Sequence, residues 1–121
     1  MQSRQKKILV VDDEPDILEF LQELLVQEGY AVAVAERAEY IDTLCDDILP
    51  DLILIDILLS GKDGREIVRR LKRQPETGHI PVIMFSAHPG AEPTVLAAGA
   101  DDFVAKPFEM DEILAKIAMH V

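Results

Sequence analysis

Four acidic residues follow the first strongly apolar segment of the chain almost without interruption. Ile8 to Val11 are apolar, and Asp12, Asp13, Glu14 and Asp16 come next, with a proline among them. Carboxylates this close together repel one another, which disfavours such a cluster at the end of a buried segment. A divalent cation relieves that repulsion, and magnesium prefers oxygen ligands that include one or two carboxylates. The stretch therefore indicates a metal site, although an isolated pair of acids would be explained by the preference of carboxylates for a helix N-terminus.

Three other apolar segments also end in residues that could take part in chemistry. Asp56 follows "LILI", Ser86 follows "VIMF", and Lys106 follows "FVA" and precedes Pro107. Taken alone, Asp56 and Ser86 are ordinary turn residues, and Lys106 is an ordinary surface lysine. Those separate interpretations do not explain why each residue stands directly after an apolar segment. The common placement predicts a single site if the apolar segments are strands of one sheet.

The apolar segments have the length and character of β-strands. The run "LILI" does not alternate between apolar and polar residues, which is typical of a strand buried on both faces of a parallel sheet. Helical patterns separate the segments, and this alternation predicts an α/β fold with one open, doubly wound sheet and right-handed crossovers. The five expected strands are Ile8–Val11, Val32–Val34, Leu52–Ile55, Val82–Phe85 and Phe103–Ala105.

Five helices are expected between and after these strands. The first begins at Pro15 and stops at Gly29, with Ile17, Leu21 and Leu24 on its inner face. The others are a helix from about Ala38 to Ile48, one capped by Asp63 with Ile67, Val68 and Leu71 inward, a short one ending at Gly99, and a last one with Met110, Ile113, Leu114 and Ile117 on one face.

This architecture brings the polar residues together. In open α/β sheets the ligand site lies beyond the carboxyl ends of the strands, where the strand order reverses. Asp12, Asp13 and Asp56 would then meet Ser86 and Lys106 on one rim of the sheet. Without a metal ion, one ammonium cannot neutralise three carboxylates, so mutual repulsion is expected to raise the pKa of at least one of them above roughly 4.

Four segments of the chain resemble the signature segments of receiver domains from two-component response regulators. They are "VVDDEPD", "DLILIDILLSGKDG", "MFSA" and "ADDFVAKPF", in the order and spacing of that family. The resemblance implies a flavodoxin-like (βα)5 fold with strand order 2-1-3-4-5. It also implies a signalling switch rather than an enzyme in the usual sense. The switch would accept a phosphoryl group from a sensor histidine kinase or a phosphotransfer protein and would use magnesium, with manganese as an alternative ion.

The resemblance assigns roles to the acidic residues. Asp56 would be the phosphoacceptor and a metal ligand, Asp13 a direct metal ligand, and Asp12 a ligand through water. Leu58 would offer its backbone carbonyl to the metal. The chemistry agrees with these assignments, since phosphoryl transfer to a carboxylate needs positioning and neutralisation of charge more than any other help.

The resemblance also implies how the signal would leave the site. Ser86 and Lys106 would contact the phosphoryl oxygens, and Ser86 with Phe103 would form a switch that alters the face made by the fourth helix, the fifth strand and the fifth helix. The bond between Lys106 and Pro107 would be cis. Leu58 and His88 stand at positions that could modulate dephosphorylation, because neither is the residue most common there.

Composition limits the partners. The chain has 121 residues and a formal net charge of -11, which disfavours binding of nucleic acid or an anionic membrane surface. Its single cysteine, Cys45, cannot form an internal disulfide, so a cytoplasmic location is expected. Residues 1–121 are interpreted as a single receiver domain with a flexible segment at 1–6. A downstream effector protein or a missing output domain would receive the signal, and dimerisation is left open.

The same residues disfavour three other functions. A flavin-binding electron carrier shares the fold but needs hydrogen-bond donors in the first loop, which is acidic here. A haloacid-dehalogenase-type phosphatase needs a second acid two residues after its nucleophile, where Leu58 stands. An EF-hand loop beginning at Asp12 needs glycine at its sixth position, which Ile17 occupies. The remaining alternative is a receiver-like interaction module that never accepts phosphate.

Overall fold

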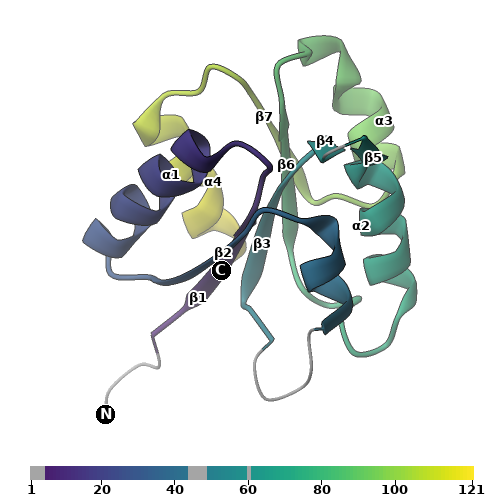
Figure 1. The fold of residues 1–121 in the computed structure, drawn as a ribbon, viewed down its shortest axis with the longest axis horizontal. Coiled ribbons are helices and arrows are strands. Elements are labelled where there is room, and N and C mark those ends of the chain that lie inside the picture. Colours follow the sequence, from purple (N-terminus) through teal and green to yellow (C-terminus); the bar gives the residue numbers. More distant parts are fainter. Residues whose placement is uncertain (1–4, 44–48, 60) are drawn as a thin grey trace.

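The core of the molecule is a five-stranded parallel sheet in the order β2-β1-β3-β6-β7. The computed structural model describes residues 5–43, 49–59 and 61–121. Figure 1 shows the sheet between two layers of helices. The strands are β1 (Lys7–Val11), β2 (Ala31–Ala35), β3 (Leu52–Asp56), β6 (Val82–Ser86) and β7 (Asp102–Ala105). Counted along the sheet this is the predicted 2-1-3-4-5 order, so the α/β flavodoxin-like fold is confirmed.

The central strands are apolar on both faces because both faces are covered. All five residues of β3 and all five of β6 are buried. Figure 1 shows α1 and α4 on one side of the sheet and α2 and α3 on the other. The helical elements are α1 (Pro15–Gln27), the 3-10 helix η1 (Ala38–Thr43), α2 (Gly64–Arg73), the 3-10 turn η3 (Pro89–Ala91), α3 (Glu92–Ala97) and α4 (Met110–His120).

Several helix ends follow the predicted local chemistry. Pro15 occupies the first turn of α1, where its missing N–H costs nothing. Gly29 follows the helix with φ of 95°, a conformation that side chains with a Cβ disfavour. Asp63 caps α2 by accepting a hydrogen bond from the backbone N–H of Arg65 at 2.9 Å. Glu109, at the start of α4, makes no side-chain capping bond.

The buried face of one helix differs from the prediction. In α1 the buried residues are Leu18, Leu21 and Leu25, whereas Ile17 and Leu24 are half-buried at the margin of the core. The inner face of this helix is therefore rotated by about one residue from the expected one. In α4 Ile113 and Ile117 are buried as expected.

The expected inner face of α4 is only partly observed. Met110 is 50% exposed and Leu114 is only half-buried, so the inner face of the helix is narrower than predicted. His120, at the end of α4, is half-buried, and its Nε2 lies 3.1 Å from a carboxylate oxygen of Asp102.

Two segments were not predicted in their observed form. The described part of the expected helix from Ala38 to Ile48 is a 3-10 helix, while residues 44–48, including Cys45, lie outside the described residues. A small antiparallel hairpin, β4 (Leu58–Leu59) and β5 (Lys62–Asp63), follows β3. Of the segment expected to be flexible, residues 1–4 are not described, whereas the carbonyl of Lys6 accepts a bond from the backbone N–H of Ala31 at 2.8 Å.

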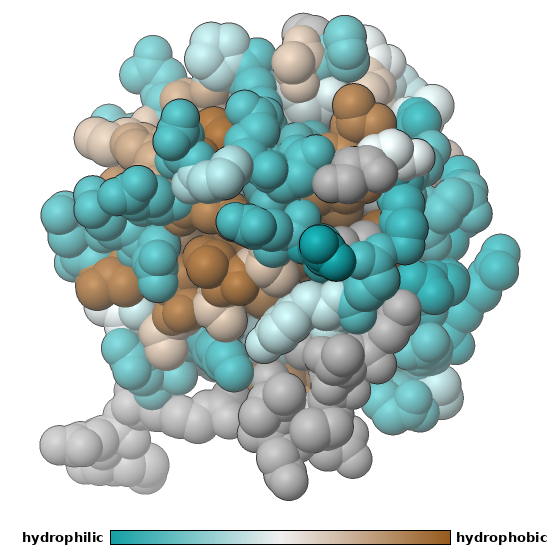
Figure 2. All heavy atoms as spheres, viewed as in Figure 1, coloured by the Kyte–Doolittle hydropathy of each residue, from teal (hydrophilic) through white to brown (hydrophobic). Residues whose placement is uncertain are grey.

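The surface is mostly polar, with scattered apolar residues. Figure 2 shows hydrophobic side chains mainly over the part of this face formed by α1 and β2, and hydrophilic ones over α2. Phe20 and Val26 of α1 are 42% and 54% exposed. Within the described residues, the structure contains no helix long and apolar enough to cross a lipid bilayer.

Candidate functional site

The ammonium of Lys106 joins the carboxyl ends of three strands. Its Nζ donates to Oδ2 of Asp56 at 2.9 Å and to Oδ2 of Asp12 at 3.2 Å, and it lies 3.5 Å from Oε1 of Glu14. It also lies 4.9 Å from the centre of the Phe85 ring, a distance at which a cation is attracted to the ring face. Residues far apart in sequence therefore converge on one rim, as the strand-end pattern predicted.

The four carboxylates of this rim are close enough to share an ion. Asp12, Asp13, Glu14 and Asp56 each offer an oxygen within 4.8 Å of the others, the one such group of His, Cys, Asp or Glu side chains within the described residues. Asp12 is fully buried and Asp56 is 7% exposed, whereas Glu14 is exposed. An all-oxygen set with both buried and accessible carboxylates suits magnesium, which keeps several water ligands.

Burial sets the protonation of Asp12 more than repulsion does. Its pKa is raised from 3.8 to about 6, chiefly because burial disfavours the charged form; the Asp56 charge adds to the shift. The backbone N–H of Glu14, which donates to Asp12 Oδ1 at 2.9 Å, and the Lys106 ammonium both oppose it. The expectation of a raised carboxyl pKa is therefore confirmed for Asp12, but its largest cause was wrongly given as mutual repulsion.

Lys106 keeps its charge in this setting. Burial alone would lower the pKa of its ammonium, but the bond to Asp56 and the charges of Asp12 and Asp56 outweigh it, so the pKa is raised above the ordinary value. A permanently charged ammonium beside two carboxylates can also stabilise negative charge brought to the site from outside.

The backbone beyond Asp56 is packed tightly against the start of α2. The N–H of Leu58 donates to Asp56 Oδ1 at 3.4 Å, and Leu58 is 65% exposed. Gly64 lies so close that an added Cβ would stand 2.2 Å from the carbonyl oxygen of Asp56. Only glycine allows this contact, so Gly64 helps to fix the position of Asp56.

The expected switch residues lie on neighbouring strands. Ser86 is 4% exposed, and its Oγ accepts a hydrogen bond from the backbone N–H of His88 at 3.0 Å. Phe103 is 5% exposed and stands opposite Met84 in the β6–β7 register, two residues before Ser86. The Lys106–Pro107 peptide bond is cis. The backbone N–H of Lys106 donates to the Ser86 carbonyl at 2.7 Å, which joins the last two strand ends.

An apolar hollow beside the rim was not predicted. It has a volume of about 340 Å³ and is lined by Ile17, Phe20, Ala87, Lys106, Pro107 and Phe108. Phe108 contacts Phe85 edge-on, with ring centres 6.1 Å apart, and also lies beside Phe20. The sequence shows that Phe108 directly follows "AKP" and that Phe20 stands among other apolar residues of the first helix, but neither observation shows that the two rings meet.

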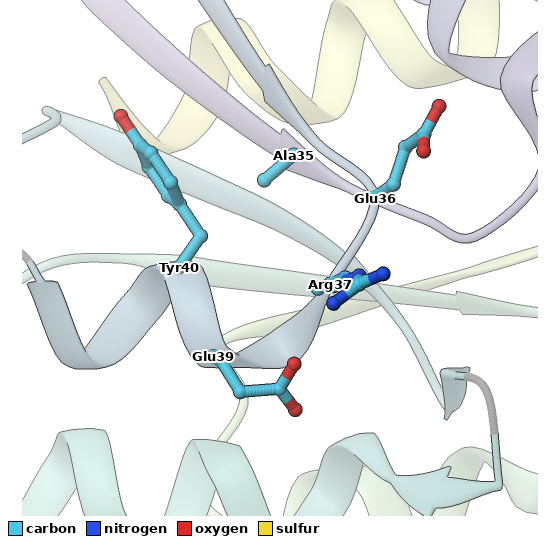
Figure 3. A pocket seen from close by; sticks show the side chains of 5 residues that line it. All are labelled: Ala35, Glu36, Arg37, Glu39 and Tyr40. Atoms are coloured by element: carbon cyan, nitrogen blue, oxygen red, sulfur yellow. The ribbon is translucent and has the colours of Figure 1, made fainter.

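A second hollow lies apart from the predicted residues. It has a volume of about 510 Å³ and is lined by Ala35, Glu36 and Arg37 after β2 and by Glu39 and Tyr40 of η1. In Figure 3 the side chains of Glu39 and Tyr40 point away from one another. Glu39 is held by an ion pair with Lys62. These side chains do not converge on a common point, and none is among the predicted site residues.

The chain is similar to a known family and to several known proteins. Residues 8–118 match the family described as "Response regulator receiver domain". The phosphate regulon transcriptional regulatory protein PhoB of Pseudomonas aeruginosa is 40% identical over 114 residues, which are 93% of this chain and 50% of that protein. The chain therefore spans about half the length of the curated relatives it matches.

Solved structures agree with the fold. A putative response regulator from Chloroflexus aurantiacus has a TM-score of 0.89 and 31% identity and covers 96% of this chain and 97% of its own. The response regulator TrrA from Thermotoga maritima was solved in complex with Mg(2+)-BeF. It has a TM-score of 0.86 and 32% identity, and the match covers 97% of this chain and 100% of TrrA.

Proposed function

This chain belongs to the family of response regulator receiver domains, and on that premise we propose that it is a switch that accepts a phosphoryl group on Asp56. The contact between the Lys106 ammonium and Asp56 at 2.9 Å, with Asp12 at 3.2 Å, is the observation that carries this proposal. A carboxylate at the end of a buried strand, paired with a charged lysine and close to further acids, suits attack on phosphorus.

The acidic rim fits magnesium as its cofactor. Asp13 and Asp56 would hold the ion directly, Asp12 through water, and the carbonyl of Leu58 would complete the protein ligands. The fit rests on four carboxylates whose oxygens lie within 4.8 Å of one another, two of them on buried residues. When bound, magnesium supplies positive charge that neutralises the carboxylates and the incoming phosphoryl oxygens. Manganese, with similar ligand preferences, is an alternative ion.

The reaction is a transfer between two proteins. A carboxylate oxygen of Asp56 attacks the phosphorus of a phosphohistidine, an O–P bond forms, and the N–P bond breaks with its electron pair left on the imidazole nitrogen. Lys106 stays close to the new acyl phosphate as a positive charge, and Ser86 donates a hydrogen bond to one of its oxygens. Movement of Ser86 toward that oxygen leaves space for Phe103 to repack. This would change the face formed by α3, β7 and α4.

The donor would be a sensor histidine kinase or a phosphotransfer protein. It must bring its phosphohistidine over Asp56, and the apolar hollow beside Lys106 lies next to that path. Phe20 and Phe108 at this hollow offer apolar surface for a donor helix. After activation the altered face would act on an effector protein or an output domain, in the cytoplasm. Leu58 and His88, on the loops after Asp56 and Ser86, would influence how long the acyl phosphate lasts.

The test uses a small acyl-phosphate donor with magnesium, followed by intact mass measurement. One labile phosphoryl adduct is expected in the wild type and in Asp111→Asn, which changes an exposed acid of α4 that does not belong to the acidic rim, and none in Asp56→Asn. An adduct that persists in Asp56→Asn, or that forms equally well in chelator, contradicts the assignment. If the wild type forms no adduct with either a small donor or a phosphohistidine protein, the alternative of an interaction module that never accepts phosphate is favoured.

A further inference from the structure

Arg65 joins three segments of the chain near the candidate site. Its Nε donates to both carboxylate oxygens of Asp63 at 2.9 and 3.2 Å, and Nη2 donates to Oδ2 at 2.9 Å. Its Nη1 donates to Oγ1 of Thr94, on α3, at 2.9 Å. Figure 1 shows the β4–β5 hairpin beside α2 and α3, where this bridge lies. The proposed phosphoryl transfer gives Arg65 no role.

One end of this bridge is tied to the phosphoacceptor. Asp63 pairs with Leu58 across the β4–β5 hairpin. The N–H of Leu58 donates to Asp56 Oδ1 at 3.4 Å, and the N–H of Gly64 donates to the carbonyl of Ile57. A group that holds Asp63 therefore also holds the backbone that directly follows Asp56.

The other end is tied to the loop that follows Ser86. Oγ1 of Thr94 donates to the carbonyl of Ala91 at 2.8 Å, and the N–H of Ala91 donates to the carbonyl of His88 at 3.0 Å. The N–H of His88 in turn donates to Oγ of Ser86 at 3.0 Å. Consecutive hydrogen bonds thus lead from Arg65 to both loops that border the site.

The simplest interpretation of Arg65 is an ordinary surface ion pair. Its side chain is 30% exposed and that of Asp63 is 40% exposed, and such pairs contribute little to stability. Two observations go beyond that interpretation. The guanidinium holds Asp63 through two nitrogens, which lowers the pKa of that carboxyl, and still has a third N–H for Thr94. Lysine has no such planar fork, so this geometry depends on arginine.

We propose that Arg65 is a positioning residue that couples the backbone following Asp56 to helix α3 through Thr94, by a route that does not require movement of Ser86. The inference rests on the proposed function, in which the Leu58 carbonyl is a metal ligand. When magnesium is bound, Leu58 is held in one position; Asp63 pairs with Leu58, and Arg65 carries this constraint to Thr94. Helix α3 then responds to the metal before any phosphoryl group arrives, because two sites that bias one element are coupled.

The experiment is a magnesium titration followed by backbone amide chemical shifts in the wild type, Thr94→Val, Thr94→Ser and Ser86→Ala. In the wild type, shifts are expected at Asp13 and Leu58 and also at Val95 on α3. Thr94→Val removes the hydroxyl, which accepts from Arg65 and donates to the Ala91 carbonyl, at nearly the same side-chain volume. The magnesium-induced shift at Val95 should therefore be lost while those at the site remain. Thr94→Ser restores the hydroxyl and should restore the Val95 shift, and Ser86→Ala should keep it.

The magnesium affinity and the melting temperature of the Thr94 variants distinguish coupling through Thr94 from a general loss of structure. Thr94→Val should weaken the magnesium affinity by no more than about fivefold, the low end of common coupling factors, and should melt close to the wild type. Equal Val95 shifts in Thr94→Val and the wild type overturn the inference, as does loss of that shift in Ser86→Ala. A Thr94→Ser variant that also loses the shift, with a much lower melting temperature, overturns it too. No shift at Asp13 and Leu58 in the wild type means that the metal site itself is absent, and the proposed function then fails with the inference.

Discussion

The Lys106 ammonium lies 3.2 Å from a carboxylate oxygen of Asp12, a residue whose side chain has no exposed surface. A buried carboxylate is tolerated when a charge and hydrogen bonds stabilise it, and here Lys106 and the N–H of Glu14 provide both. The compensation is incomplete, because the pKa of Asp12 is still raised to about 6. The charged form of Asp12 is therefore destabilised in the folded protein, and a bound cation would reduce this destabilisation.

Asp12→Asn is expected to stabilise the metal-free protein near neutral pH. The folded pKa of Asp12 is raised from 3.8 to about 6, so its contribution to stability is complete below pH 3.8 and is lost as pH rises through about 6. The loss is at most about 3 kcal/mol above pH 7, since each pKa unit corresponds to about 1.4 kcal/mol. Asparagine keeps an acceptor for the Glu14 N–H and removes the charge.

Thermal melting in chelator at pH 4 and pH 7.5 checks this expectation. The variant should melt higher than the wild type at pH 7.5 and about equally at pH 4. Magnesium at tenfold over its Kd should stabilise the wild type by about 1.4 kcal/mol and the variant by less. An advantage of the same size at both pH values would show that the charge of Asp12 is not its cause.

Lys106→Met is expected to destabilise the metal-free protein and to make it more dependent on magnesium. Methionine fills similar volume but leaves Asp12 and Asp56 buried without their ammonium, which costs about 1–3 kcal/mol. A bound divalent ion replaces that charge, so the melting temperatures of variant and wild type should converge as magnesium rises. Lys72→Met, which removes the Lys72–Asp101 ion pair remote from the rim, serves as control and should show no such convergence. If Lys106→Met melts like the wild type in chelator, the ammonium does not stabilise the rim.

The strand ends were predictable because they combine two strong signals. Asp56, Ser86 and Lys106 each follow a short apolar run, and parallel strands bring such ends to one edge whatever their side chains touch. The buried face of helix α1 was harder to predict from the sequence. Residues 17, 18, 20, 21, 24, 25 and 26 of α1 are all apolar, so the pattern is too wide to distinguish Leu18 and Leu25 from Ile17 and Leu24 as the centre of the buried face.

Other features had only a weak sequence signal, such as the turn dipeptide Ser60–Gly61 in the segment after Asp56. The β4–β5 hairpin has two-residue strands, too short to display a period of two. The bond from Arg65 to Thr94 joins side chains 29 residues apart, and it depends on how α2 and α3 pack rather than on any local pattern. The main cause of the raised pKa of Asp12 was also missed. A sequence shows that charged residues are neighbours, but it does not show how deeply a carboxylate is buried, and burial is the larger cause here.

Gly64→Ala is expected to lower stability by about 1–3 kcal/mol and to slow phosphorylation of Asp56. The new Cβ would stand 2.2 Å from the Asp56 carbonyl oxygen and 3.1 Å from the end of the Met84 side chain, so the backbone of the phosphoacceptor must shift. Gly90→Ala is the matched control, because an added Cβ there meets nothing within 4 Å. Urea unfolding and the rate of adduct formation from an acyl-phosphate donor measure both effects. If Gly64→Ala and Gly90→Ala behave alike, the close contact with Asp56 is not required.

Phe20→Ala is expected to slow phosphoryl transfer from a protein donor but not from a small acyl-phosphate donor. Phe20 is 42% exposed and lines the hollow beside Lys106, but it has no contact role in the carboxylate chemistry. A protein donor that docks on this hollow should therefore transfer more slowly by about tenfold, the effect of losing roughly 1–2 kcal/mol of apolar contact. A small acyl-phosphate donor, which needs no docking surface, should react as with the wild type.

Met119→Ala provides the control for this experiment, since Met119 is an exposed apolar residue of α4 outside the hollow. Both variants should be compared with the wild type for the rate of transfer from a phosphorylated histidine protein and from the small donor. A Phe20→Ala variant slowed equally with both donors would point to damage at Asp56 instead of lost docking. Normal transfer from the protein donor would mean that the donor approaches Asp56 over a different part of the rim, and the hollow would then have no part in recognition.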